Sequence, residues 1–194
     1  MTRTSFFLAL SLCAASVAAE DHARHGVPVS AAPATTRQYA IADLPVLTQD
    51  GTSIHFYRDL VKGRLVVMNF VFTSCTTICP TMGATFARVQ ALLGKRKDVS
   101  LISVSIDPGN DTPERLAAWS HRLGGGPGWT LVTGRSPDIS EILKSLGVYT
   151  YSPASHTPVV LVGDESAGRW ERVDGLATPK AIVAALGRVS GAAE

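Results

Sequence analysis

The sequence predicts an α/β fold in which helices flank a mixed β-sheet and a β-hairpin comes first. Two observations carry this prediction. Apolar runs typical of strands buried on both faces alternate with segments of helical spacing, as in a sheet built from strand–helix units. After the last of these units, two strands follow one another before the final helix, so antiparallel pairs are expected beside the parallel ones.

The folded domain is expected to begin near Gln38 with the hairpin. Its expected strands are Leu44–Leu47 and Ser53–Tyr57, joined through the turn sequence Gln49-Asp50-Gly51. The next segment, Leu65–Phe72, is a nearly unbroken apolar run with β-branched and aromatic residues. That composition predicts a strand buried on both faces.

A helix and a second buried strand are expected to follow. Pro80–Leu93 carries apolar residues at helical spacing, and Gly94 is suited to end this helix because glycine readily adopts the left-handed conformation found there. Val99–Ile106 is again apolar and β-branched, which predicts the second strand.

Three later helices are expected to begin alike, at Thr112-Pro113, Ser136-Pro137 and Thr178-Pro179. In each pair the hydroxyl residue caps the helix, and the proline takes the first helical position, where its missing N–H costs nothing. A hairpin after parallel units narrows the fold to a thioredoxin-like mixed sheet. The remaining expected strands are Trp129–Val132, Val159–Val162 and Trp170–Val173.

The length and charge of the chain indicate a single globular domain with no nucleic-acid partner. A chain of 194 residues suits one domain with its own core, here expected over residues 38–190. The 18 basic and 16 acidic residues are interspersed and give a net charge of +2, so no nucleic-acid partner is expected. Residues 20–37 are rich in Ala, Pro, Ser and Thr without periodicity, which predicts a flexible linker.

Residues 1–19 are predicted to be a secretory signal peptide, which indicates a periplasmic protein. Arg3 supplies the positive charge, Phe6–Val17 is apolar, and Val17-Ala18-Ala19 offers small residues for cleavage. The apolar segment is shorter than the about 20 residues that span a bilayer. An uncleaved signal that anchors the protein in the membrane remains the alternative.

Two cysteines, Cys75 and Cys79, are left once Cys13 is removed with the signal. They lie where a buried strand passes into a helix, whose unpaired N–H groups stabilise a thiolate. A loop that short constrains little of the unfolded chain, so chemistry explains the pair better than structural cross-linking does. A separation of four residues spans about one helical turn of 5.4 Å, so both sulfurs can face one metal ion. Disulfide exchange also remains open.

His156 is the candidate for a third ligand. It lies in the loop before the strand Val159–Val162, and in a thioredoxin-like sheet that loop abuts the start of the cysteine helix. Two soft thiolates and one imidazole suit copper as Cu(I), which accepts three ligands, whereas zinc needs a fourth. The other histidines are expected to be solvated, hydrogen-bonded or in the linker: His22, His25, His55 and His121.

Three further residues near the cysteines are expected to be structural. Met82 lies on the apolar side of the predicted helix and is expected to pack in the core. Asp107 and Asp111 follow a strand at the end where open α/β sheets place their sites. We expect Asp111 and Thr112 to cap the next helix, and neither aspartate to be a ligand.

Three segments, NFVFTSCTTICPTM, SIDPGNDTPERLAAW and SHTPVVLVGD, resemble in this order the signature blocks of the Sco (SenC-type) family. The resemblance covers Tyr39–Leu186. It implies a thioredoxin-like copper chaperone that helps to mature the copper A centre of cytochrome c oxidase, with subunit II as the recipient. It also implies that Cys75, Cys79 and His156 bind Cu(I) or Cu(II).

Two other activities are considered, and whether the protein is an enzyme stays open. A thiol–disulfide oxidoreductase would use Cys75 and Cys79 to reduce the cysteines of the copper-receiving protein. A thiol peroxidase is less favoured because Phe72 stands where such enzymes carry an upstream proline. The chain also departs from the Sco pattern, since Ser155 replaces the acidic residue that usually precedes the histidine and a cleavable signal replaces the usual anchor.

The Thr157–Pro158 peptide bond is predicted to be cis. Thioredoxin-like proteins place a cis-proline just before the strand that faces their cysteines, and Pro158 directly precedes such a strand. A cis bond would turn the chain so that His156 approaches the two sulfurs. The Cα–Cα distance decides, because it is about 2.9 Å across a cis bond and 3.8 Å across a trans bond.

Signal cleavage after Ala19 is expected to create a second, Cu(II)-binding site at the new N-terminus. The mature chain would begin Glu20-Asp21-His22, in which a free amine, two amides and an imidazole can surround Cu(II) in a square plane. Mass spectrometry of the exported protein checks the premise. Any start other than Glu20 removes the site.

Overall fold

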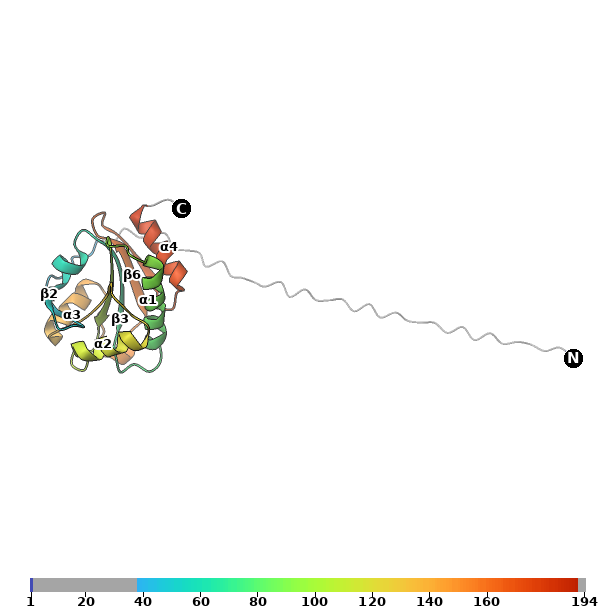
Figure 1. Ribbon diagram of the computed structural model, residues 1–194, viewed down its shortest axis with the longest axis horizontal. Coiled ribbons are helices and arrows are strands. Elements are labelled where there is room, and N and C mark those ends of the chain that lie inside the picture. The colour runs from blue at the N-terminus through green and yellow to red at the C-terminus, as the bar shows by residue number, and fades with distance from the viewer. Residues whose placement is uncertain (2–37, 192–194) are drawn as a thin grey trace. The chain divides into compact units, whose positions relative to one another are not determined.

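A seven-stranded mixed sheet forms the centre of the protein (Figure 1). The computed structural model describes Met1 and residues 38–191. The strand order is β2-β1-β5-β4-β3-β6-β7; the pairs β3–β4 and β4–β5 are parallel, and the other pairs are antiparallel. The strands are β1 (Pro45–Thr48), β2 (Ser53–His55), β3 (Leu65–Val71), β4 (Val99–Ser105), β5 (Trp129–Thr133), β6 (Val159–Asp164) and β7 (Arg169–Asp174).

In the described part of the chain, four α-helices flank the sheet, and the order of strands and helices is the predicted one. Among the described residues, no helix is both long enough and apolar enough to cross a membrane. Two short helical segments were not predicted, a π-helical segment at Phe56–Val61 and a 3-10 turn at Pro153–Ser155. The α-helices are α1 (Cys79–Leu93), α2 (Pro113–Arg122), α3 (Ser136–Ser145) and α4 (Pro179–Ser190).

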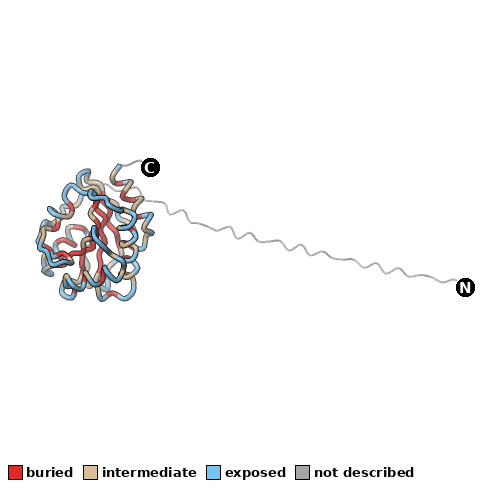
Figure 2. Tube along the Cα trace, in the orientation of Figure 1, coloured by how far each residue is buried: buried red, intermediate tan, exposed pale blue. Residues whose placement is uncertain are grey.

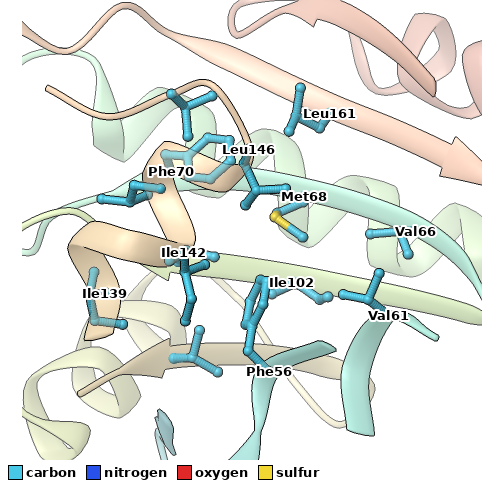
Figure 3. Close-up of a cluster of buried hydrophobic side chains, with 14 of the residues drawn as sticks. Phe56, Val61, Val66, Met68, Phe70, Ile102, Ile139, Ile142, Leu146 and Leu161 are labelled. Carbon is cyan, nitrogen blue, oxygen red and sulfur yellow. The ribbon is translucent and has the colours of Figure 1, made fainter. Parts of the chain in front are cut away.

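Helices cover both faces of the sheet, as an alternating order of elements requires (Figure 1). Side chains along β3 alternate between the two faces: Met68 and Phe70 pack toward α3, whereas Val67 and Val71 pack toward α1, α2 and α4. Buried residues therefore concentrate along the central strands (Figure 2), and the α3 side forms one continuous apolar cluster (Figure 3).

The second strand of the hairpin ends two residues earlier than predicted. Ser53–Tyr57 was the expected strand, but β2 ends at His55 because Phe56 begins the π-helical segment. Phe56 and Val61 are fully buried in the cluster on the α3 side, and an extended strand would not direct both into the core. Burial of these two side chains thus overrides the strand pattern.

Two of the three predicted helix caps are confirmed. Thr112 Oγ1 accepts from the backbone N of Arg115 at 3.3 Å, and Thr178 Oγ1 accepts from the backbone N of Ala181 at 3.2 Å. The prediction for Ser136 is wrong, since this residue is already helical and Arg135 occupies the cap position. Arg135 instead pairs with Asp138 in the first turn, at 3.3 Å between Nε and Oδ2.

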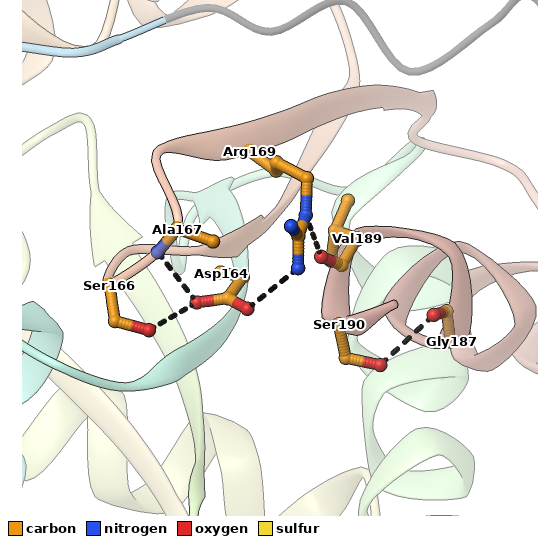
Figure 4. A network of polar contacts seen from close by, with 7 residues as sticks. All are labelled: Asp164, Ser166, Ala167, Arg169, Gly187, Val189 and Ser190. Carbon is orange, nitrogen blue, oxygen red and sulfur yellow. Dashed lines mark hydrogen bonds and ion pairs between the residues drawn. The ribbon is translucent and has the colours of Figure 1, made fainter. Parts of the chain in front are cut away.

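The turn between β6 and β7 is fastened to the end of α4 (Figure 4). Asp164 Oδ1 accepts from Ser166 Oγ at 2.6 Å and from the backbone N of Ala167 at 3.0 Å. Arg169 bonds Asp164 Oδ2 at 3.2 Å and donates from Nε to the carbonyl of Val189 at 2.5 Å. These bonds hold the edge hairpin against the helix that covers it.

Substitution of Gly163 by alanine is expected to destabilise the protein by about 1–3 kcal/mol, because the site is already fully packed. An added Cβ would lie 2.3 Å from the Trp170 ring, which is opposite Gly163 in the sheet and buried. Urea denaturation measures the change in the free energy of unfolding.

The matched control is Gly187→Ala in α4, where a Cβ meets nothing within 4 Å. This change is expected to stabilise the helix by about 0.5–1 kcal/mol. Equal free energies of unfolding for the two variants would contradict the packing argument.

Candidate functional site

The predicted cysteines lie where β3 passes into α1. The helix begins at Cys79, one residue before the predicted start, and its cap residue is Ile78, whose side chain has no hydrogen-bond acceptor. The backbone N of Cys79 donates instead to Cys75 Sγ at 3.4 Å. A sulfur atom therefore accepts from the first N–H of α1, at the positive end of the helix dipole.

The pKa of Cys75 is lowered to about 7. Burial alone would raise this pKa, but hydrogen bonds from the Cys79 side chain, from the backbone of Cys79 and Thr77, and from the Thr77 hydroxyl outweigh it. Thr77 Oγ1 lies 3.7 Å from the sulfur. Each of these bonds favours the charged form, so a substantial fraction of Cys75 is thiolate at neutral pH.

The pKa of Cys79 is raised to about 12. Burial is the main cause, since only 1% of the residue is exposed, and the neighbouring Cys75 thiolate and the Asp111 carboxylate add to it. The backbone N–H of Phe72 opposes the shift. Both cysteines are free, and at neutral pH a partly ionised Cys75 lies beside a protonated Cys79.

His156 follows the 3-10 turn Pro153–Ser155 and precedes β6. Its Nε2 atom is buried and has no hydrogen-bond partner among the described residues. Burial lowers the pKa of the imidazole, so the ring is neutral at pH 7 and offers a lone pair. The ring meets Phe70 edge to face, with the two centroids 6.1 Å apart.

Cys75, Cys79 and His156 line one cavity of about 270 Å³. The loop Phe72–Ile78 forms one wall, and Pro153 and Ala154 form the other. Within residues 38–191, no three acidic, cysteine or histidine side chains already converge at metal-binding distance. The fold thus brings the three predicted residues into one cavity without closing them around a common point.

The Thr157–Pro158 bond is trans, so the prediction of a cis bond is wrong. That prediction invoked the cis bond to turn the chain and bring His156 toward the sulfurs. The 3-10 turn Pro153–Ser155 reverses the chain just before His156 and places the imidazole in the cavity wall.

The other histidines and Met82 lie away from this cavity. His55 Nδ1 is 3.5 Å from Asp43 Oδ2 on the surface, and His121 is exposed near the end of α2. Met82 is 1% exposed within α1, as predicted for a core residue. The predictions for Cys13, His22 and His25 lie outside the described residues.

Asp111 does not cap α2 as predicted. Thr112 alone caps that helix, while the Asp111 carboxylate points into the protein and is 1% exposed. It accepts hydrogen bonds from Thr73, in the cysteine loop, and from Ser105, at the end of β4. The sequence held no signal for the contact with Thr73, because 38 residues separate the two.

Comparison with known proteins matches this chain to one family. The SCO1/SenC family model matches residues 35–190. A SCO1 protein homologue of Bacillus subtilis (strain 168) is 32% identical over 126 residues, which are 63% of this chain and 64% of that protein. The chain thus spans less than two thirds of the length of the first relatives it matches.

Two solved structures are similar over most of the described residues. One is BsSco, a member of the Sco family of cytochrome c oxidase assembly proteins in which a disulfide switch was identified. It is 26% identical to this chain, with a TM-score of 0.66 over 80% of this chain and 96% of BsSco. Copper-bound ScoI of Bradyrhizobium japonicum is 25% identical with a TM-score of 0.64, over 77% of this chain and 99% of that one. The thioredoxin-like fold is therefore confirmed.

In the metal-free protein, Cys75 is expected to react with iodoacetamide well before Cys79, because only Cys75 is ionised near neutral pH. Its alkylation rate should rise with pH and reach half its maximum near pH 7. Mass spectrometry of the alkylated peptides measures both rates.

Thr77→Val serves as the comparison, because it removes the hydroxyl that favours the Cys75 thiolate and should move the midpoint to higher pH. Earlier modification of Cys79 would contradict the assignment of the thiolate.

Proposed function

The chain belongs to the SCO1/SenC family, and we propose that it is a copper-binding chaperone that delivers copper for the assembly of cytochrome c oxidase. Cys75, Cys79 and His156 are the proposed ligands. The observation that carries the proposal is the cavity that these three side chains share at the start of α1. The names of the relatives agree, since one solved structure holds copper and another is an oxidase assembly protein.

The donor set of the cavity fits copper. Thiolate and neutral imidazole are the ligands that Cu(I) prefers, and Cu(I) accepts three of them. Cys75 supplies a thiolate at neutral pH, and His156 supplies a neutral ring with an unpartnered buried Nε2. The same three side chains would also hold Cu(II). In this role copper is the cargo, and the protein binds and releases it.

Periplasmic location and the identity of the recipient are part of the proposal. The N-terminal signal predicted from the sequence supports export, and residues 20–37 are the predicted linker to the domain of residues 38–190. An uncleaved signal would anchor the domain at the membrane. Subunit II of the oxidase is the proposed recipient, because the copper A centre lies in that subunit.

A second role, reduction of the recipient's cysteines, is favoured by the separation of the two thiol pKa values. The Cys75 thiolate would attack a disulfide of the recipient and form a mixed disulfide, releasing one recipient sulfur as a thiolate. Cys79 would then attack Cys75, which breaks the mixed disulfide and releases the second recipient sulfur as a thiolate. The proton of Cys79 passes to one of the two recipient thiolates. Two electrons reach the recipient, and this chain is left with a Cys75–Cys79 disulfide that an external thiol reductant returns to the dithiol.

Copper retention tests the proposal directly. We expect the purified, reduced protein to bind one Cu(I), and Cys75→Ser, Cys79→Ser and His156→Ala each to weaken Cu(I) binding at least tenfold, because each removes one of three ligands. Competition with a chromophoric Cu(I) chelator measures the affinities. His121→Ala, an exposed histidine outside the cavity, is the matched control and should bind like wild type.

Disulfide exchange distinguishes the two roles. His156→Ala removes a ligand but leaves both thiols, so it should lose copper and still reduce a small disulfide substrate. Full copper retention in His156→Ala would argue for the reductase as the main role.

A further inference from the structure

We infer that Asp111 is a positioning residue of the copper site, which fixes the cysteine loop through Thr73 and places a negative charge behind that loop. The inference rests on the proposed copper function. Within residues 38–191, Asp111 forms no hydrogen bond to either cysteine. We do not propose it as a metal ligand. Its influence reaches the metal through the loop it holds and through its charge.

The contacts of Asp111 join two loops that the sheet brings side by side. Oδ1 accepts from the backbone N of Thr73 at 3.0 Å and from Thr73 Oγ1 at 2.5 Å. Oδ2 accepts from Ser105 Oγ at 2.6 Å. Thr73 lies two residues before Cys75, and Ser105 is the last residue of β4. The carboxylate therefore ties the first turn of the cysteine loop to the end of the neighbouring strand.

Burial of the Asp111 carboxylate costs desolvation free energy, and an ordinary loop does not require a buried charge. A buried charge is tolerated only when its oxygens are well hydrogen-bonded, and here both oxygens accept bonds. Bonds to a charged acceptor are also stronger than neutral ones, so the tether is rigid. A helix cap does not explain the residue, because Thr112 already caps α2.

The charge of Asp111 influences the site in addition to its hydrogen bonds. Because Asp111 is bonded to Thr73, two residues before Cys75, its carboxylate lies behind the cysteine loop, where a negative charge favours a cation in the cavity. A copper ion in the cavity has the opposite sign, and Cu(II) carries one more positive charge than Cu(I). A nearby buried carboxylate therefore stabilises Cu(II) more than Cu(I).

Two substitutions separate position from charge. Asp111→Asn removes the charge and keeps an amide oxygen that can accept from the Thr73 backbone. Thr73→Val keeps the charge and removes only the hydroxyl bond to Oδ1. Asp98→Asn is the matched control, because it removes the same charge from an exposed residue. Asp98 directly precedes β4, at the opposite end of that strand from Asp111.

The affinities of the full chain for Cu(II) and Cu(I), measured by chelator competition, test the inference. Asp111→Asn should weaken Cu(II) binding about tenfold relative to Cu(I), which for one electron corresponds to about 59 mV in the Cu(II)/Cu(I) midpoint potential. Thr73→Val should weaken both affinities together, at least threefold, with an unchanged ratio. Asp98→Asn should change neither. An unchanged ratio in Asp111→Asn, or a wild-type Thr73→Val, overturns the inference.

A copper-free measurement keeps the inference separate from the proposed function. In the copper-free protein, Asp111→Asn and Thr73→Val should each speed hydrogen exchange at the cysteine-loop amides several-fold relative to Asp98→Asn, because each weakens the bonds that hold Thr73. Unchanged exchange in both variants would count against Asp111. Wild-type protein that binds no copper would refute the proposed function, while this change in exchange would still show that Asp111 fixes the loop. If Asp111→Asn does not fold, the parallel loss of both affinities in Thr73→Val decides the question.

Discussion

The hydrogen bond from the first N–H of α1 to Cys75 Sγ is the interaction on which the site depends. A helix N-terminus needs acceptors for its free N–H groups, and Ile78 supplies none. Because a sulfur atom meets part of this need, the cysteine loop must wrap over the end of the helix. One contact therefore caps the helix and is among the hydrogen bonds that favour the Cys75 thiolate. Local structure and reactivity are coupled at this corner.

The topology of the sheet supplies the rest of the site. β3 and β4 are parallel neighbours, so the loops that leave their carboxyl ends lie side by side, one carrying Cys75 and the other Asp111. β6 runs antiparallel to β3 on its other side, and so its beginning lies at the same end and brings His156. The strand order thus brings three distant segments to one end of the sheet. The hydrogen bonds of Asp111 tie two of them together, the cysteine loop and the end of β4.

Periodicity in the sequence predicted the strands and helices well. Features that depend on contacts between distant residues could not be predicted from it. The buried strands, the helices and the caps at Thr112 and Thr178 all follow from local patterns that the structure confirms. The sharing of one cavity by the cysteines and His156 also followed, because the order of elements implied the topology. Asp111 was misjudged because a carboxylate beside a helix start looks like a cap. Only the folded sheet reveals that Thr73 is its partner.

In the proposed copper site, the unequal pair of thiols would favour a thiophilic ion such as Cu(I) over hard, oxygen-preferring ions. Metal binding to both sulfurs must displace the proton of Cys79, whose pKa is about 12. A hard, oxygen-preferring ion gains too little from sulfur to offset that loss, whereas Cu(I) binds thiolate strongly. The same proton keeps the empty site from carrying two buried negative charges next to Asp111. Protonation of Cys79 would therefore stabilise the empty state of the proposed site and favour a soft cation in the filled one.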